Sequence, residues 1–426
     1  MNTVRFPYGK EYLTYDFSKE NFLGCLTSSQ HGYEPPLRGE ALIREAMASP
    51  IGSPSLYELA KGKRRIVLIA SDHTRPVPSR IIIPPMLEEI RAAEPQAEIT
   101  ILIATGCHRD TTREELVAKF GEKIVCEEHI VVHDAGKEED LVHLGTLPSG
   151  GALRINRLAA EADLLIAEGF IEPHFFAGYS GGRKSVLPGI ASRETVLANH
   201  CSEFIAHPLA RTGVLDGNPV HRDMLWAAKR AGLAYIVNVV IDENKDAIYA
   251  VAGDVEEAHL AGCTFLSGLC RVSPRYADIA VSTNGGYPLD QNIYQSVKGM
   301  TAAEATVRRG GVIIMISKAN DGHGGEAFYR QLADEPDAEK TMAQFLSRGR
   351  HETVPDQWQT QIFLRVLSRA TVIFVSDAPA EMVSAMHMIP ARNLDEAMIR
   401  AKQILGMDAP TVVAIPDGVS VMVVEE

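Results

Sequence analysis

The stretch RIVLIASDHTRPVPSRIIIPPMLEEIRAAEPQAEITILIATGCHRD, residues 65–110, contains the pattern that predicts the fold. It begins with an apolar, largely β-branched run at 65–72, continues with a stretch of helical character at 81–93, and reaches a second apolar run at 99–106. The apolar runs are continuous and do not alternate with polar residues, which is typical of strands buried on both faces. A strand, a helix and another strand in this order predict an α/β fold with parallel strands.

The same pattern extends along most of the chain. Further apolar runs that end near a glycine, aspartate or serine lie at 129–135, 163–170, 235–242, 278–286, 311–317, 371–377 and 411–418. Stretches of helical character lie between several of them, for example at 112–121 and 393–406. We therefore expect two α/β domains with mostly parallel sheets flanked by helices, at 1–270 and 275–406, and an active site in the cleft between them. The last segment, 409–426, follows a helix and could return to the first domain.

The composition is that of a soluble protein and argues against several classes of partner. The 426 residues are 46% hydrophobic, which is ample for buried cores, and 55 acidic residues against 42 basic ones give a net charge of −13. Because duplex binding needs a basic surface, no nucleic acid partner is expected. There is no run of eighteen apolar residues and no signal-like start, and the six cysteines form no C-x-x-C pair. These features predict a cytoplasmic protein with no membrane partner.

Polar side chains follow the predicted strands at their carboxyl ends, where open α/β sheets bind ligands. The first run leads into Asp72, Thr74 and Arg75, and the second leads into His108. Taken alone, Asp72 is best explained as the cap of the next helix, and Arg75 as the partner of a carboxylate on the surface. His108 is the more informative residue, because it follows a turn glycine directly after a buried strand.

The run at 163–170 leads into EPHFFAGYSGGRKSVLPG, residues 172–189, which only partly matches a phosphate-binding loop. In G-x-x-x-x-G-K-[ST] a glycine precedes the lysine, whereas here Arg183 precedes Lys184. This argues against a nucleoside triphosphatase, and the absence of G-x-G-x-x-G argues against a nicotinamide dehydrogenase. The turn at Ser180, Gly181 and Gly182 is still expected to let the backbone approach a phosphate.

The segment GGYPLDQNIYQSVKGM, residues 285–300, suggests a second group of functional side chains. Gln295 and Lys298 are one turn apart on a predicted helix and so share one face, with Tyr294 beside them. Trp358 is one of only two tryptophans, and it fits interior packing as well as it fits a pocket wall.

Five segments together resemble the nickel-dependent lactate racemase family along essentially the full length of the chain. They are SDHTRPVPSR, ATGCHRD, EPHFFAGYSGGRKSVLPG, ANH and YQSVKG, in the order and at the spacing of the family. The resemblance implies a nickel-pincer nucleotide, which is a pyridinium-3,5-bisthiocarboxylic acid mononucleotide that carries nickel. It implies that Lys184 holds this cofactor through a thioamide and that His200 is a nickel ligand, although His200 alone would read as a packing histidine. Thr74 and the turn at 180–182 are expected to line the cofactor.

The resemblance also implies a set of roles around the substrate. His108 and His174 match the paired acid/base residues, Arg75 and Lys298 match the groups that hold the substrate carboxylate, and Gln295 lies near them. Asp72 matches a residue that positions its neighbours. Maturation is expected to need cofactor-synthesis proteins.

The expected reaction is the interconversion of the two enantiomers of a small 2-hydroxy acid, most simply lactate. Removing hydride from the chiral carbon while a base takes the hydroxyl proton gives a planar keto acid, and returning the hydride to the other face inverts the centre. A base on each side suits this task, because histidine titrates near neutral pH. Tyr294 and Trp358 would crowd the side-chain end of the pocket and favour a small substituent. The alternatives are a racemase or epimerase of a larger acid (malate, aromatic or sugar acid) and a non-catalytic nucleotide- or carboxylate-binding protein.

Overall fold

The computed structural model describes residues 2–424, which form two compact units. The first unit consists of Gln30–His200 and His207–Gly268. The second unit consists of the described residues up to Ser29, the short segment Cys201–Ala206, and the described residues from Leu269 onward. Within residues 2–424, no helix combines the length and the apolar character needed to cross a bilayer.

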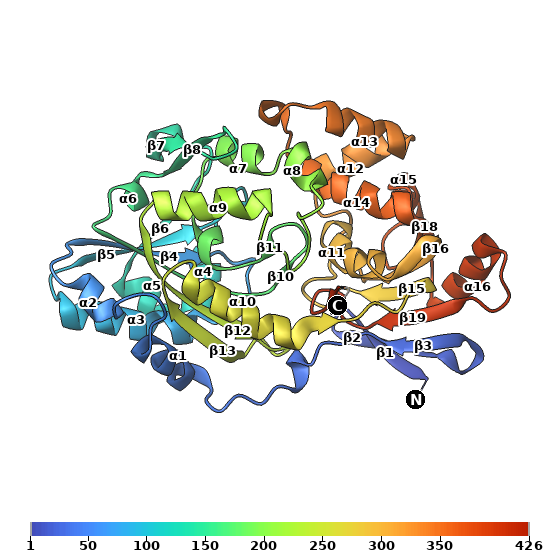
Figure 1. The fold of residues 1–426 in the computed structure, drawn as a ribbon, viewed down its shortest axis with the longest axis horizontal. Helices are drawn as coiled ribbons and strands as arrows, with labels where there is room; N and C mark the ends of the chain where they lie inside the picture. Colours follow the sequence, from blue (N-terminus) through green and yellow to red (C-terminus); the bar gives the residue numbers. More distant parts are fainter. Residues whose placement is uncertain (1, 425–426) are drawn as a thin grey trace. The chain divides into compact units, whose positions relative to one another are not determined.

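The first unit is built on a six-stranded sheet with the order β13-β12-β9-β4-β5-β6 (Figure 1). Its strands are β4 (Arg65–Ser71), β5 (Glu98–Ala104), β6 (His129–Val132), β9 (Leu164–Phe170), β12 (Leu233–Ile241) and β13 (Ala247–Gly253). Only β13 is antiparallel to its neighbour. The three strands β9, β4 and β5 are adjacent and parallel, so the segments that follow them leave the sheet at one edge.

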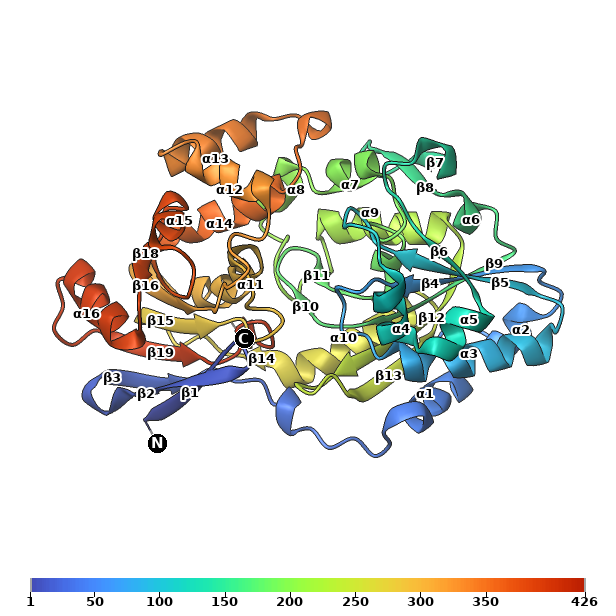
Figure 2. The ribbon, with the colours of Figure 1, turned by 180° about the vertical axis from the view of Figure 1, so that it is seen from behind.

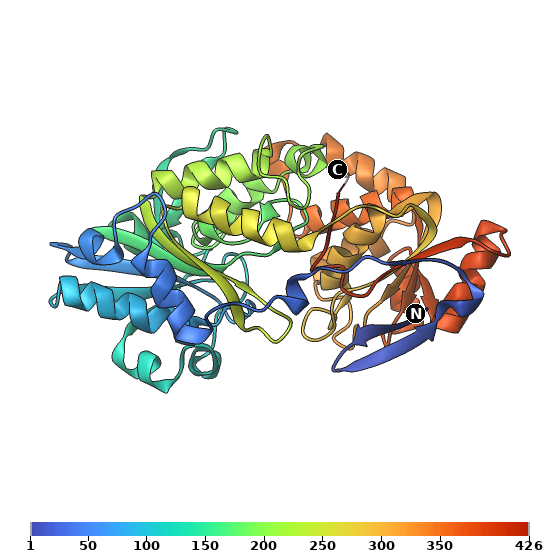
Figure 3. The ribbon, with the colours of Figure 1, turned by 60° about the horizontal axis from the view of Figure 1, so that its bottom comes forward.

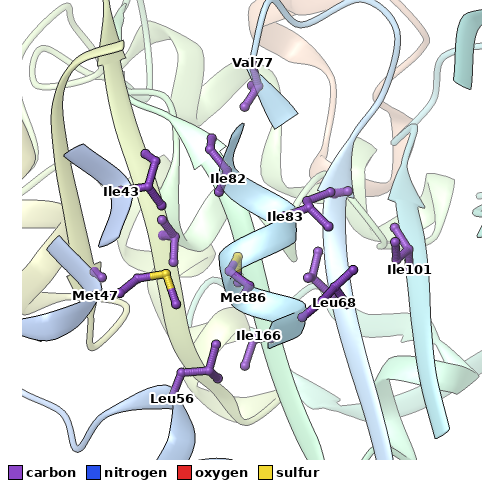
Figure 4. Close-up of a cluster of buried hydrophobic side chains, with 14 of the residues drawn as sticks. Ile43, Met47, Leu56, Leu68, Val77, Ile82, Ile83, Met86, Ile101 and Ile166 are labelled. Atoms are coloured by element: carbon purple, nitrogen blue, oxygen red, sulfur yellow. The ribbon is translucent and has the colours of Figure 1, made fainter. Parts of the chain in front are cut away.

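One face of this sheet is covered by α1 (Gly39–Ala48), α2 (Leu56–Ala60) and α3 (Ser79–Ala93). Figure 4 shows Ile43 and Met86 of these helices packed toward Leu68 and Ile166 of the strands, and all four side chains are fully buried. The other face carries α9 (Pro219–Arg230) and the 3-10 turn η4 (Gly182–Ser185), and Figure 2 shows α9 on the side of the sheet opposite α1–α3. The glycine-rich turn of the sequence therefore lies between a helix and the sheet.

The second unit contains a parallel six-stranded sheet with the order β18-β17-β16-β15-β19-β3. Its strands are β3 (Asn21–Cys25), β15 (Ala277–Thr283), β16 (Val307–Ile316), β17 (Thr371–Val375), β18 (Ile389–Ala391) and β19 (Thr411–Ile415). The hairpin of β1 (Thr3–Tyr8) and β2 (Glu11–Asp16) and the helix α16 (Leu394–Leu405) pack on one face of this sheet, and α11 (Ile293–Glu304) and α14 (Gln357–Arg369) pack against its strands as well.

All nine strands predicted from apolar runs are present, and the α/β fold with mostly parallel sheets is confirmed. The structure differs from the expected boundaries at both ends of the chain. The first residues were assigned to the first domain, but β3 pairs with β19, and Phe6 and Phe17 are buried in the core of the second unit. The final segment does not return to the first sheet, since β19 pairs with β15. Figure 3 shows the red C-terminal segments beside the dark blue N-terminal strands. The N-terminal strands escaped prediction because their apolar residues are few and alternate.

Candidate active site

The first group of predicted residues lies at the carboxyl ends of β4 and β5. Asp72 directly follows β4, and its Oδ2 lies 2.7 Å from Nδ1 of His108, which follows β5. Asp72 is 1% exposed, whereas the side chain of His108 is 45% exposed. A buried carboxylate therefore holds the inner nitrogen of a histidine whose ring reaches solvent.

The surroundings of Asp72 keep it charged. Its Oδ1 accepts hydrogen bonds from the hydroxyl and the backbone N–H of Thr74, at 2.7 and 3.2 Å. Burial opposes the charge, but the hydrogen bond and charge of His108, followed by Arg75 and Thr74, outweigh it and lower the pKa of Asp72 to about 2. Since the carboxylate accepts from His108 Nδ1–H, the lone pair of the neutral ring is at Nε2, as a general base requires.

The second group follows β9. His174 lies in the short strand β10 (Pro173–His174), which pairs with β11 (Gly178–Tyr179). Its Nδ1 accepts the backbone N–H of Ala177 at 3.3 Å, and its ring stacks on Phe175 and meets Phe176 edge-on. This contact favours the neutral tautomer that carries its proton on Nε2. The two predicted acid/base histidines are therefore held differently.

Phe176 brings three predicted residues together. Its ring centroid lies 5.6 Å from Nζ of Lys184, 4.5 Å from the ring of His174 and 5.2 Å from the ring of His200. Phe176 itself is 4% exposed. The predicted tether, one predicted acid/base residue and the predicted metal ligand thus surround one buried phenyl ring.

His200, the predicted nickel ligand, lies at the C-terminal end of α7 (Arg193–Asn199). Its Nδ1 lies 2.9 Å from the Val196 carbonyl oxygen and so carries the proton, which leaves the lone pair on Nε2. Burial, and then the charge of Lys184, lowers the pKa of His200 to about 3. The ring is neutral at physiological pH, which is the form that binds metals. In residues 2–424 no group of three or more His, Cys, Asp or Glu side chains gathers as a metal site.

The glycine-rich turn packs closely against the protein itself. Gly181 has a φ of +80°, and a Cβ there would lie 2.8 Å from the Phe170 carbonyl oxygen. Gly182 has a φ of +52°, its N–H donates to Asn238 Oδ1 at 2.7 Å, and a Cβ would lie 2.8 Å from the ring of His259. Ser180 is buried and donates to Glu172. Tight packing therefore explains both glycines, and the N–H of Gly182 is engaged by Asn238.

The first two groups are joined through their backbones. The N–H of Gly106, two residues before His108, donates to the Gly189 carbonyl oxygen at 2.9 Å. Gly189 ends the segment that contains Lys184, and its own N–H donates to the Lys184 carbonyl oxygen at 3.1 Å. Because β9, β4 and β5 are also neighbours in the sheet, both groups lie at one edge of the first unit.

The remaining predicted residues form a third group in the second unit. Tyr294, Gln295 and Lys298 lie in the first turns of α11, and Trp358, which is half-buried, lies at the start of α14. Gln359 Nε2 donates to the Tyr294 carbonyl oxygen at 2.5 Å, so the two helix starts touch. Burial raises the pKa of Asp356, which accepts from the Tyr294 hydroxyl. The helix predicted to carry Tyr294, Gln295 and Lys298 is present, and the Gln359 bond brings the start of α14 to its first turn.

Sequence reasoning missed the residues that support these groups. Glu168 is buried within β9 and accepts from the N–H and hydroxyl of Ser71 and from the hydroxyl of Ser79, which fixes the end of β4 and the start of α3. Lys119 Nζ donates to the Arg75 carbonyl oxygen at 3.0 Å. A glutamate in an otherwise apolar strand was the available signal for Glu168, whereas nothing in the helix at 112–121 marked Lys119.

Known proteins match this chain along its whole length. The family models described as "Lactate racemase N-terminal domain" and "Lactate racemase C-terminal domain" match residues 8–213 and 272–423. A lactate racemase of Thermoanaerobacterium thermosaccharolyticum is 55% identical over 100% of both chains, and one of Lactiplantibacillus plantarum is 53% identical over 99% of this chain and 100% of its own.

Solved structures agree with the sequence comparison. The lactate racemase apoprotein from T. thermosaccharolyticum superposes with a TM-score of 0.95 at 54% identity, covering 99% of this chain and 100% of its own. A Thermotoga maritima protein shares the fold at a TM-score of 0.65 and 19% identity, covering 91% of this chain and 98% of its own. Two domain models and full-length relatives at this identity leave one assignment, and the chain belongs to the lactate racemase family.

Proposed function

We propose that this chain is a racemase that interconverts the enantiomers of lactate through a keto-acid intermediate. The arrangement of His174, Lys184 and His200 around Phe176 is the observation that carries the proposal. Simple binding of a nucleotide or a carboxylate would not need two histidines with ordered tautomers, which argues against a non-catalytic role.

The residues present fit a nickel-pincer nucleotide. His200 is neutral at physiological pH and has its lone pair on Nε2, which suits a nickel ligand. Lys184 Nζ lies over the ring that His200 also contacts, as a covalent tether beside the metal would require. When bound, the nucleotide would supply reversible uptake of hydride. Thr74 and the turn at Ser180 are further candidates for contacts with it.

The chain's own residues would move the hydroxyl proton. His108 Nε2 takes the proton from the substrate hydroxyl, and Asp72 stabilises the imidazolium that forms. His174 serves the opposite enantiomer. To accept a proton at Nε2, its ring must move its own proton to Nδ1 and give up the contact with Ala177.

The substrate carboxylate would be held by guanidinium and ammonium groups. Arg75 can bind a carboxylate with two parallel hydrogen bonds, and the Lys119 bond to its carbonyl fixes its backbone. Lys298 and Gln295 are proposed as further substrate contacts. Tyr294 and Trp358 are bulky, which favours a small substituent on the 2-hydroxy acid over an aromatic or sugar acid.

The activity is tested by maturing the full chain with cofactor-synthesis proteins and incubating it with single enantiomers of lactate, malate and an aromatic 2-hydroxy acid. Chiral chromatography should show conversion of either lactate enantiomer to an equal mixture. His108→Asn should lower kcat by about 10²-fold or more, because a positioned general base is lost. Inversion of malate without inversion of lactate would overturn the substrate assignment.

The tether is tested separately by intact mass and peptide mapping. The matured protein should carry the mass of the nucleotide on the peptide with Lys184, and Lys184→Ala should carry none. Active matured protein with an unmodified Lys184 would refute the covalent model and leave the racemase proposal standing.

A further inference from the structure

Arg183 is a fully buried cation to which the proposed mechanism assigns no role. It lies in η4 next to Lys184, and its relative exposure is 0%. Among the described residues no carboxylate forms an ion pair with its guanidinium. Burial lowers the pKa of Arg183 to about 10, so it stays charged at neutral pH. A buried, unpaired charge is costly, and proteins keep one only where hydrogen bonds replace its hydration.

The guanidinium is satisfied by the loop that carries the proposed catalytic residues. Its NH2 nitrogen donates to the Ala177 carbonyl oxygen at 2.7 Å, and its NH1 nitrogen donates to the Gly181 carbonyl oxygen at 3.2 Å. One planar group thus bonds two backbone oxygens four residues apart, on either side of the turn.

These two residues are the ones that hold His174 and Lys184. The N–H of Ala177 donates to His174 Nδ1, and the N–H of Lys184 donates to the Gly181 carbonyl oxygen at 3.1 Å. Arg183 therefore bonds both a residue that sets the tautomer of His174 and the oxygen that anchors the backbone of Lys184.

Two histidines lie against the guanidinium, and one of them accepts a hydrogen bond from it. Its Nε donates to Nδ1 of His221 on α9 at 3.0 Å, and Nε2 of His259 on α10 (Glu257–Cys270) lies 3.1 Å from its NH1. His259 Nε2 donates to the Ser180 carbonyl oxygen at 2.8 Å, so His259 packs against the guanidinium and bonds the loop beside it. Burial, and then the charge of Arg183, lowers the pKa of His221 to about 3 and that of His259 well below its usual value, so both rings are neutral. The helices α9 and α10 thereby hold the planar guanidinium of Arg183 against the loop.

We propose that Arg183 is a positioning residue that sets the acid/base residue His174 and the tether Lys184 in fixed relation to each other, through Ala177 and Gly181. The inference rests on the proposed function for the roles of these two residues. A lysine at this position would keep the charge but lacks the planar fork that reaches both oxygens.

The test compares Arg183→Lys with His221→Ala, which removes one acceptor and leaves the guanidinium in place. Met86→Ala serves as the control, because it removes a buried side chain from the other face of the same sheet. Hydrogen exchange of the full apo chain measures the loop directly. In Arg183→Lys the amides of 174–186 should exchange roughly 10-fold faster, and in His221→Ala less so, while Met86→Ala should loosen the sheet and α3 instead.

Two further measurements separate positioning from general stability. In ¹⁵N-histidine-labelled protein, with His174 assigned by its loss in His174→Asn, Arg183→Lys should shift the ring signals of His174, and Met86→Ala should not. After maturation, the Arg183→Lys chain should carry at least about 5-fold less adduct on Lys184 than a Met86→Ala chain of equal Tm.

Each outcome decides one proposal. Unchanged exchange over 174–186 and unchanged His174 signals in both loop variants would overturn the role of Arg183. Wild-type protein that gains no adduct and no activity would overturn the proposed function, and the exchange and NMR results on apo protein would still report on Arg183.

Discussion

At the scale of single residues, the Asp72–His108 pair links stability to pH. The pKa of Asp72 is lowered to about 2 from a usual 3.8, so the carboxylate stabilises the fold above the unfolded pKa, and this contribution is lost as pH falls from about 4 to 2. The shift corresponds to about 2 kcal/mol. Asp72→Asn should lower the free energy of unfolding by that order at pH 7 and by much less near pH 2.5, as measured by urea titration at both pH values. If the free energies of unfolding of the wild type and Asp72→Asn differed equally at both pH values, the charge of Asp72 would not be the cause of the difference.

The residues that could be picked out from the sequence are polar or titratable side chains next to apolar segments. His108 and His174 stand out because polar side chains directly follow apolar strands, and the structure brings Asp72 to His108 as this position suggests. Phe176 and Arg183 could not be singled out in the same way. A phenylalanine beside another reads as ordinary core, and the arginine's four contacts depend on a turn and two helices that are distant in sequence.

At the scale of elements, the short helix α7 has its N-cap, Ser192, at one end and the predicted metal ligand, His200, at the other. Ser192 Oγ accepts the N–H of Thr195 at 3.2 Å, and His200 caps the other end after only seven helical residues. Ser192→Ala should cost about 1 kcal/mol and, because the helix has two turns, should also displace His200. Nickel content of the matured protein should fall. Ser55→Ala, which removes the equivalent cap from α2, should cost similar stability at unchanged nickel content, and equal nickel loss in both variants would contradict this link.

Strands were predictable where a continuous apolar run fitted only a strand that is buried on both faces. The strands that form the centres of both sheets satisfy this condition, since they are continuous and buried on both faces. The hairpin of β1 and β2 and the edge strand β3 do not, because they hold few buried side chains: β1 buries only two, and every residue of β2 and β3 is exposed or partly exposed. The place of β3 is decided by its pairing with β19, nearly four hundred residues later, and that of the hairpin by packing on the second core, and no local pattern contains either contact.

At the scale of the whole molecule, the N-terminal segment should stabilise the second unit and not the first. Phe6 and Phe17 are fully buried in the second core, and β3 covers the edge of β19. Removing residues 2–25 should cost on the order of 5 kcal/mol in that unit, because it exposes these two rings and leaves a strand edge unpaired. Limited proteolysis with mass mapping should then find new cleavage sites between 277 and 415, while 65–170 stays protected. Ile43→Ala, in the core of the first unit, should give the opposite pattern, and cleavage concentrated in 65–170 after the N-terminal deletion would contradict the assignment of this segment.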